Sequence, residues 1–500
     1  MNKRVVLIGF HNEKALGVRY LSVAARAHGY EPIVVFFKGF NSEVPEHATD
    51  TELKLLQDFI REKDPILVGL SAMSSLYFET LQKVNAAVRA ATSAPVAWGG
   101  VLASLDPAVA LQYADFVMRA EGEETLIDVL RAIETGGDIK SIDNIAYLNE
   151  DGSVHLNPIR PLVEDIDKFG HPPVNGKDMY LITNNKLTPG DPQVHAFTYE
   201  LLASRGCPFS CTYCSAINLH RLYGSASKYV RFRSVDSVLS ELNEAKANIP
   251  KLRVVHFWDE VFSNEPGWVD EFCARYKKEI GIPFRIWGHP MMVSEDLITK
   301  LVDAGLYQVV MGIQSGSERV RRDVFHRYEP QDRVIEATRV LSRCKVPHVF
   351  YDLMLLHAFE SPEDLRQTFE MCLELEPPFE LNIHGLNYLP GTDIVDMAIQ
   401  AGYYTPEEMH SMMYSSLQEQ YDRHWGPAAS VYKQASTGNP WISLIYLTQF
   451  PELHDQLRAF ADKLDDPATR KAVFALEVKM KKRQRLVHFI NKVKLVLRIK

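Results

Sequence analysis

The first 135 residues alternate short apolar runs with longer stretches in which apolar residues recur every three or four positions. The short runs predict buried β-strands, and the periodic stretches predict amphipathic helices. Strands separated by helices indicate a parallel, doubly wound sheet, which binds ligands at the carboxyl ends of its strands. The expected strands are 4–9, 31–37, 66–71, 95–99 and 116–119, and the expected helices are 15–28, 49–63, 78–92 and 123–135.

Prolines and glycines interrupt this periodicity between residues 137 and 194. Such a stretch predicts a linker, so we expect the first domain to cover 1–136. Within the linker, two apolar runs at 144–148 and 154–157 flank Asp151-Gly152, a dipeptide typical of tight hairpin turns. The linker is therefore expected to hold no more than a small hairpin.

A second alternation of strands and helices runs from residue 195 to residue 402. Six strand–helix units in one direction predict a partial (β/α)6 barrel, so the fold class is α/β in both domains. The expected strands are 195–203, 253–258, 284–288, 308–314, 348–356 and 381–388, and the expected helices are 235–247, 267–279, 294–304, 333–343 and 362–374.

The last part of the chain, 403–500, has helical periodicity and no strand-like run, which predicts a helical C-terminal domain. Its end is markedly basic and amphipathic. A basic amphipathic helix can lie on an anionic membrane or pack on its own barrel, and the sequence leaves both open. The apolar face consists of Leu486, Phe489, Ile490, Val493 and Leu497, with Lys494 and Arg498 away from it.

Composition narrows the class of protein. The chain is 46% hydrophobic and 24% charged, as in ordinary globular proteins. A net charge of -9 argues against a general nucleic-acid binder. No apolar run approaches the roughly 18 residues that cross a bilayer, and the N-terminus lacks a signal-peptide cleavage site. We therefore expect a cytoplasmic protein whose six cysteines do not form a disulfide framework.

Three cysteines, Cys207, Cys211 and Cys214, lie within eight residues directly after the first barrel strand, where barrel active sites are found. Structural zinc takes four closed ligands, and His220 would be a fourth at unusual spacing. A cubane iron–sulfur cluster normally takes four thiolates, so three leave one iron open. An open iron can chelate a substrate through an amine and a carboxylate and pass an electron to it.

The Cys-x3-Cys-x2-Cys spacing, with the aromatic Tyr213 before the last cysteine, resembles the radical S-adenosylmethionine (SAM) superfamily. The resemblance implies that the three cysteines hold a [4Fe-4S] cluster, whose open iron binds SAM and cleaves it to a 5′-deoxyadenosyl radical. It also implies that the ends of later barrel strands hold the methionine amine, the ribose and the carboxylate of SAM. The implied SAM contacts are Tyr213, Asp259, Glu260, Gln314 and Ser315.

This chain departs from the family pattern in two places. Many relatives have Glu where this chain has Gln314, and residues 355–360 (LLHAFE) replace the expected Gly-Pro-Gly loop after the fifth barrel strand. The resemblance therefore assigns no adenine contacts. Arg231 and Arg233, before the first barrel helix, are either carboxylate-binding groups or solvated arginines.

The N-terminal domain resembles cobalamin-binding domains in Gly69-Leu70-Ser71-Ala72-Met73 followed by Gly99-Gly100. Residues 121–124 (EGEE) resemble a loop common in cobalamin-dependent radical enzymes. The resemblance implies a slot in which small residues admit the nucleotide tail of cobalamin and the Ser71 hydroxyl binds it. The implied cobalamin contacts are Asn12, Lys14, Gly17, Ser71, Met73, Gly99, Gly100, Glu121 and Gly122.

The classical cobalamin loop, Asp-x-His-x-x-Gly, supplies a histidine to the lower face of cobalt. Aligning its glycine with Gly17 puts Asn12 at the Asp place and Lys14 at the His place. An ammonium group has no lone pair to give to a metal. Because His11 lies out of register, we expect cobalt to lack an axial nitrogen.

Over residues 1 to about 400, the combined resemblance implies a cobalamin-dependent radical SAM enzyme. The leading interpretation is a methyltransferase acting on an unactivated carbon of a small molecule, natural product or lipid. A cyclase, oxidase or ring-rearranging enzyme is one alternative, and a cobalamin-binding sensor with a structural metal is another. The implied partners are a small-molecule substrate and an electron donor such as flavodoxin or ferredoxin, without nucleic acid. The basic tail leaves a peripheral membrane contact open.

Overall fold

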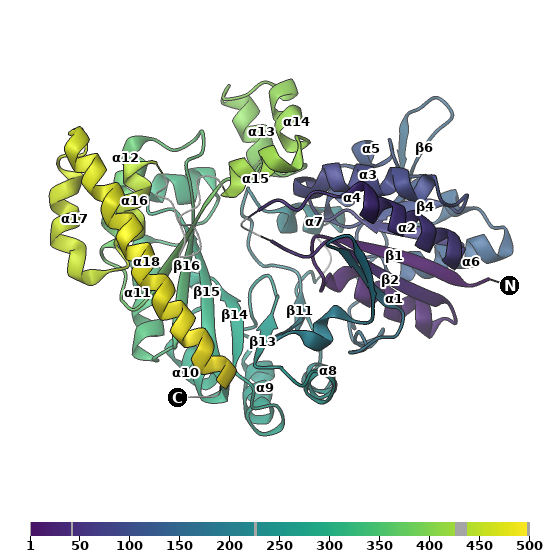
Figure 1. The fold of residues 1–500 in the computed structure, drawn as a ribbon, viewed down its shortest axis with the longest axis horizontal. Coiled ribbons are helices and arrows are strands. Elements are labelled where there is room, and N and C mark those ends of the chain that lie inside the picture. The colour runs from purple at the N-terminus through teal and green to yellow at the C-terminus, as the bar shows by residue number, and fades with distance from the viewer. Residues whose placement is uncertain (1, 42–43, 225–227, 426–437, 498–500) are drawn as a thin grey trace.

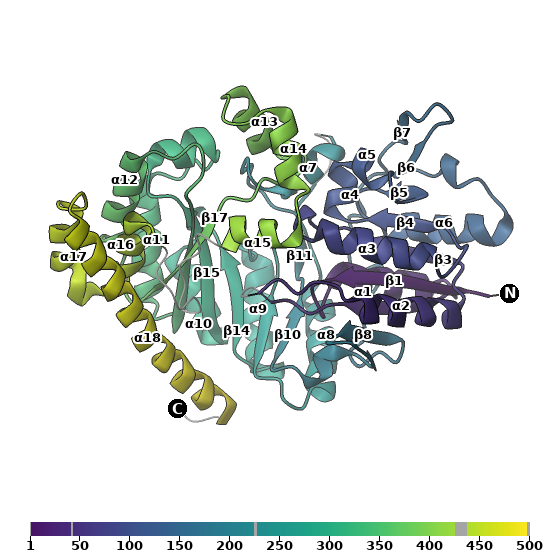
Figure 2. The same ribbon diagram turned by 45° about the horizontal axis from the view of Figure 1, so that its top comes forward.

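The computed structural model describes residues 2–41, 44–224, 228–425 and 438–497, without the side chains of 491–492 and 494–497. Two α/β units lie side by side, and helices near the C-terminus pack on the outer flank of the second unit (Figures 1 and 2). Within the described ranges, no helix combines the length and apolarity needed to span a bilayer.

The N-terminal unit is built on a nine-stranded sheet of order β7-β6-β5-β4-β3-β1-β2-β8-β9. Its five central strands are parallel, and helices cover both faces over separate apolar cores, as the sequence predicts. The strands are β1 (Arg4–Phe10), β2 (Glu31–Phe37), β3 (Leu67–Ser71), β4 (Val96–Gly99) and β5 (Phe116–Met118), and the helices are α1 (Leu16–Ala27), α2 (Asp50–Lys63), α3 (Phe78–Arg89), α4 (Val101–Leu105), α5 (Pro107–Ala110) and α6 (Glu123–Thr135).

The expected linker is wrong, because residues 137–194 form both edges of this sheet. The hairpin of β6 (Ile145–Leu148) and β7 (Val154–Leu156) extends the sheet beyond β5 through antiparallel pairing. At the other edge, β8 (Met179–Thr183) pairs parallel with β2, and β9 (Lys186–Pro189) closes the edge. Pro189 lies in the edge strand β9, where one side needs no ladder hydrogen bond, and the other prolines of this stretch lie outside the strands. The prolines that suggested a linker are therefore compatible with sheet edges.

The second unit is an open six-stranded parallel sheet in sequential order, β10-β13-β14-β15-β16-β17, which confirms the predicted strand order. Helices cover one face over the largest apolar core. The strands are β10 (Thr198–Leu201), β13 (Val254–Phe257), β14 (Phe284–Gly288), β15 (Leu306–Gln314), β16 (His348–Leu355) and β17 (Glu380–Gly385), and the helices are α8 (Val235–Asn248), α9 (Pro266–Glu279), α10 (Glu295–Ala304), α11 (Gln331–Arg343) and α12 (Pro362–Cys372).

The described part of 403–500 is helical, as expected, but it is not one separate domain. Helix α15 (Leu417–Trp425) lies between the two units: the Leu417 amide donates to Glu79 at 2.8 Å, and His424 Nδ1 lies 3.2 Å from the Gly385 carbonyl. The later helices share the core of the barrel. Helix α13 (Asp393–Gln400) precedes this region, whose other helices are α14 (Pro406–Met413), α16 (Pro440–Leu447), α17 (His454–Ala461) and α18 (Pro467–Leu497).

Candidate active site

The three-cysteine loop connects the short strand β11 (Ser204–Arg205) to helix α7 (Ser215–Leu222). Gly206 in this loop has φ of +93°, and a Cβ there would lie 2.5 Å from the Tyr229 carbonyl oxygen. Only glycine fits that backbone and that space. The backbone therefore turns sharply just before Cys207 and carries the cysteines to the carboxyl end of the barrel strands.

The cysteine thiols are buried or half-buried, and none forms a disulfide. Burial raises the pKa of Cys207 to about 11 and that of Cys214 to about 12. Glu260 adds to both shifts, so its carboxyl lies near these two sulfurs. Thiols of this kind are neutral on their own and become thiolates when a metal centre compensates their charge, so the donor set suits iron–sulfur ligation.

His220, the fourth ligand that the structural-zinc alternative would need, makes a different contact. Among the described residues, no three His, Cys, Asp or Glu side chains gather as ligands of a single metal ion would. His220 instead stacks on Tyr229, with ring centroids 4.3 Å apart. Thiolates that ligate different irons of a cluster need not converge on one point, so this finding does not disfavour a cluster.

Asp259 and Glu260, adjacent in sequence, have different roles. The Asp259 carboxylate is buried and accepts hydrogen bonds from the Ala203 amide, at 3.1 and 3.2 Å, and from the Ser204 hydroxyl. Burial raises the pKa of Asp259 to about 6. Asp259 therefore fixes the turn between β10 and β11, whereas Glu260 is the exposed carboxyl near the cysteines.

Tyr213 and the end of β15 are held by Arg327, which sequence reasoning missed. This buried guanidinium donates to the Tyr213 hydroxyl at 3.2 Å and to the Gly312 carbonyl at 2.6 Å. Glu329 neutralises it, with Oε1 2.7 Å from Arg327 Nε. Arg327 thus ties the cysteine loop to the segment that contains Gln314.

Gln314 and Ser315 also differ in their surroundings. Gln314 has φ of +74° at an irregularity in the pairing of β15 with β16, and it is half-buried. Ser315 is fully buried, and its hydroxyl accepts from the Ser317 amide at 3.2 Å and lies 3.4 Å from the Thr368 hydroxyl. Ser315 therefore stabilises the turn after β15, and Gln314 is the more accessible of the pair.

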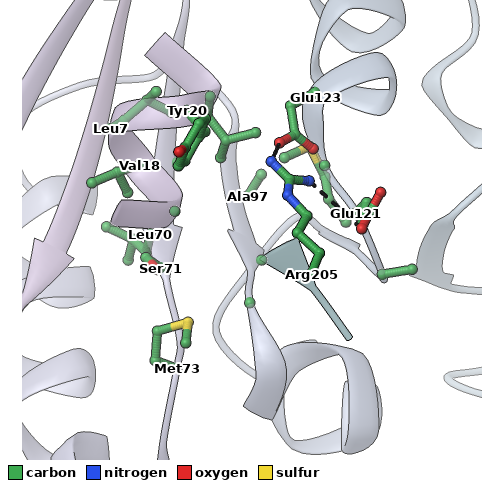
Figure 3. A pocket seen from close by; sticks show the side chains of 18 of the residues that line it. Leu7, Val18, Tyr20, Leu70, Ser71, Met73, Ala97, Glu121, Glu123 and Arg205 are labelled. Carbon is green, nitrogen blue, oxygen red and sulfur yellow. Dashed lines mark hydrogen bonds and ion pairs between the residues drawn. The ribbon is translucent and has the colours of Figure 1, made fainter. Parts of the chain in front are cut away.

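A cavity of about 220 Å³ lies at the carboxyl ends of β3, β4 and β5, against the barrel (Figure 3). Several glycines line it, and at Gly100, with φ of +98°, a Cβ would lie 2.9 Å from the Ala72 carbonyl oxygen, so only glycine lets the loop after β4 pack against the segment after β3. Seven of the nine expected cobalamin contacts line this cavity: Gly17, Ser71, Met73, Gly99, Gly100, Glu121 and Gly122. An apolar slot of this kind, floored by glycines and bordered by a serine hydroxyl, fits a flat nucleotide tail.

Arg205 forms the barrel side of the cavity and joins it to the cysteine loop (Figure 3). Its guanidinium lies 2.5 Å from Glu123 Oε1 and 3.6 Å from Glu121 Oε1. Arg231 also pairs with Glu121, and Arg233 pairs with Glu241. Arg231 and Arg233 are buried and each pairs with a carboxylate, so the alternative of solvated arginines is wrong. Arg231 joins the two units, and Arg233 anchors α8.

Asn12 and Lys14 do not line the cavity. Asn12 Oδ1 accepts from the Lys14 amide at 2.8 Å, and Lys14 Nζ lies 2.5 Å from Glu200 Oε1 on β10. Lys14 thus bridges the two units at the place where the classical cobalamin loop has its histidine. The contact is long-range, so the loop sequence alone could not reveal it.

His11 faces the opposite direction, into the N-terminal unit. Its Nε2 lies 2.9 Å from the Thr80 hydroxyl, and its ring stacks on Tyr77 with centroids 4.3 Å apart. Burial, followed by the nearby Lys38 charge, lowers the pKa of His11 to about 3. The imidazole is therefore neutral and packed between α3 and the sheet.

Comparison with known families matches two separate regions of the chain. Residues 201–372 match the Radical SAM superfamily, and residues 11–130 match the B12 binding domain. The two matches together cover more than half of the chain. The first contains the cysteine loop, and the second contains most of the cavity lining.

Three curated relatives align over most of the chain. The uncharacterized methyltransferase PH0819 of Pyrococcus horikoshii is 24% identical over 70% of this chain and 73% of its own length. Cytidylyl-2-hydroxyethylphosphonate methyltransferase of Streptomyces wedmorensis is 23% identical over 80% of each chain. Anaerobic magnesium-protoporphyrin IX monomethyl ester cyclase of Rubrivivax gelatinosus is 22% identical over 72% of this chain and 62% of its own.

Two solved structures share the fold. The radical SAM methyltransferase TsrM from Kitasatospora setae superposes with a TM-score of 0.63 at 17% identity, over 80% of this chain and 77% of its own. The cobalamin-dependent SAM radical enzyme OxsB superposes with a TM-score of 0.61 at 15% identity, over 98% of this chain and 72% of its own. With both matched regions, the donor set of the cysteine loop and the adjoining slot in place, the chain belongs to the cobalamin-dependent radical SAM enzymes, whose cofactors are a [4Fe-4S] cluster, SAM and cobalamin.

Proposed function

We propose that this enzyme methylates an unactivated carbon of a small molecule. The observation that carries the proposal is Arg205, which borders the cavity and lies two residues before Cys207. Its ion pair with Glu123 fixes the cysteine loop against the slot of the N-terminal unit. A methyl donor held in that slot and a radical generated at the cysteines would therefore act on one substrate.

In this proposal, Cys207, Cys211 and Cys214 hold the cluster, and Glu260 and Gln314 contact SAM. Ser71, Gly99 and Gly100 admit the cobalamin tail between the two units. When bound, these groups supply hydrogen abstraction and a transferable methyl group. The protein's own contribution is to hold the cluster, SAM and cobalamin around one space between the two units. Asp259, Ser315 and Arg327 fix the loops that contain the contact residues.

The substrate would bind on the concave face of the barrel sheet, opposite the helices. Side chains alternate between the two faces of a strand, so the residues that do not pack on the helices point to this face. On this face Trp258 is 40% exposed, and its ring centroid lies 5.6 Å from that of Trp287. Across the sheet, Asp352 accepts from Asn382 at 3.0 Å, and burial raises the pKa of Asp352 to about 6. Aromatic faces beside a few polar groups suit a small organic substrate.

Ring closure is the second candidate, because one of the curated relatives is named a cyclase. The two reactions differ in the fate of the SAM methyl group, since only methylation leaves it on the product. The discriminating experiment is anaerobic incubation of the reconstituted enzyme with methyl-labelled SAM, a low-potential electron donor such as flavodoxin, and small-molecule extract from the host of the chain. Label on a product carbon supports the methyltransferase; deoxyadenosine formation with a modified but unlabelled product contradicts it and supports a cyclase, oxidase or rearranging enzyme.

A further inference from the structure

Helix α18 has two faces with different surroundings. Its first half packs on the barrel through positions that recur every three or four residues, including Val473, Met480 and Gln484. On the same face, His488 lies 2.7 Å from Glu380 at the start of β17. This face therefore holds the helix against the end of the barrel opposite to the cysteine loop.

The apolar residues that follow lie on the other face. Leu486 comes two residues after Gln484, which turns the side chain by about 200° around a helix of 3.6 residues per turn. Leu486 is 61% exposed and Phe489 is 65% exposed, and Ile490 and Val493 continue the same exposed stripe. The stripe therefore points away from the barrel, which rules out the interpretation that it packs on its own domain. Leu497, Lys494 and Arg498, expected on this helix, lie outside the described side chains.

Basic residues accompany the exposed stripe. Lys479 and Lys482 are exposed and lie seven and four residues before Leu486, so they share its outer face. After Glu477 the sequence contains no acidic residue, although the whole chain has a net charge of -9. The basic residues in this stretch are Lys479, Lys481, Lys482, Arg483, Arg485, Lys492, Lys494, Arg498 and Lys500.

We propose that the outer face of α18 is a docking surface for an anionic lipid membrane. Apolar side chains flanked by lysines, in a stretch of sequence without acidic residues, match an interface of acyl chains and negatively charged headgroups. Glu452 pairs with Arg483 beside this face, and the stretch as a whole stays basic. A second copy of the chain is a poorer occupant, because every charged residue from Lys479 to Lys500 is basic, so pairing this face with itself in either direction would bring positive charges together. Since α18 contacts the amino end of β17, docking leaves the cysteine loop on the far side of the barrel, accessible from water.

The test is flotation of the full-length reconstituted enzyme with vesicles of phosphatidylcholine, with or without phosphatidylglycerol. We expect binding to the anionic vesicles at low salt, with release as salt is raised. The double variant Phe489→Ser/Ile490→Ser should lower partitioning about 100-fold through lost apolar burial. Lys479→Gln/Lys482→Gln should lower it about 30-fold. The matched control, Leu148→Ser/Leu156→Ser, removes two exposed leucines of the β6–β7 hairpin and should change nothing.

Three outcomes would overturn the proposal. One is absence of binding to anionic vesicles at low salt, and another is binding that Phe489→Ser/Ile490→Ser leaves intact. The third is a dimer in sedimentation that this variant abolishes, without vesicle binding, which would identify a second copy as the occupant. Circular dichroism checks that the variants keep their helix content, as expected for changes at exposed positions.

Discussion

Replacing Arg205 by methionine tests the ion pair that joins the cysteine loop to the cobalamin slot. Glu123 is 6% exposed, and burial alone would raise its pKa, but the Arg205 guanidinium at 2.5 Å overrides this and lowers the pKa. Without Arg205, Glu123 becomes a buried carboxylate that lacks this partner. Removing one member of a buried pair costs about 3–5 kcal/mol, so local opening of this interface should become at least about 100-fold more frequent.

The assay is hydrogen exchange measured by mass spectrometry on peptides that cover 120–127 and 203–215. Exchange in both should accelerate in Arg205→Met, and the double variant Arg205→Met/Glu123→Gln should recover much of the protection because the unpaired charge is gone. Arg89→Met removes an exposed pair with Asp115, worth at most about 1 kcal/mol, and is the matched control. Unchanged exchange in Arg205→Met, or a double variant that exchanges as fast as Arg205→Met alone, would refute the role of this pair.

Three further predictions concern the slot and its surroundings. The electron paramagnetic resonance spectrum of bound cobalt(II) should show no nitrogen-14 splitting and should be the same in His11→Ala, since the His11 ring is hydrogen-bonded to the Thr80 hydroxyl. A triplet splitting that disappears in this variant would show that His11 ligates cobalt and would contradict that contact. Ser71→Phe should fill the slot and weaken cobalamin binding at least tenfold in a titration, while iron loading is unaffected; unchanged affinity would argue against the slot. The pKa of His11 in the folded protein, about 3, lies below its value in the unfolded chain. Its contribution to stability is therefore complete above about pH 6.5 and falls by about 2 kcal/mol between pH 6.5 and pH 5. His11→Phe should lessen this acid sensitivity in thermal unfolding of the metal-free protein, and an unaltered pH dependence would show that His11 does not titrate as described.

The two sheets could be predicted from the sequence because apolar runs of strand length recur between helical stretches, and β2 and α6 begin and end where the pattern places them. The edge strands within 137–194 could not be predicted, because short strands that contain or adjoin proline lack a continuous run of apolar residues. Seven residues of the cavity could be predicted from local sequence motifs, because each lies near the end of a predicted strand or the start of a predicted helix.

Contacts between residues far apart in the sequence could not be predicted. Nothing near Arg205 in the sequence indicates that Glu123 is its partner, and nothing near Lys14 indicates Glu200. Adjacent residues can also face opposite ways at a strand end, which separates the buried Asp259 from the exposed Glu260. Burial of polar groups in pairs across a domain interface is a tertiary property, so it carries no periodic signal.

The central claim is that the three cysteines hold a cluster that cleaves SAM beside a separate cobalamin slot. The most direct measurement is 5′-deoxyadenosine formed per enzyme after reduction with SAM present, with bound cobalamin quantified in the same samples. The account predicts that Cys207→Ala, Cys211→Ala and Cys214→Ala each abolish deoxyadenosine formation and retain cobalamin, because the slot lies on the other sheet. Deoxyadenosine formation at the wild-type level in any one of these variants would contradict it.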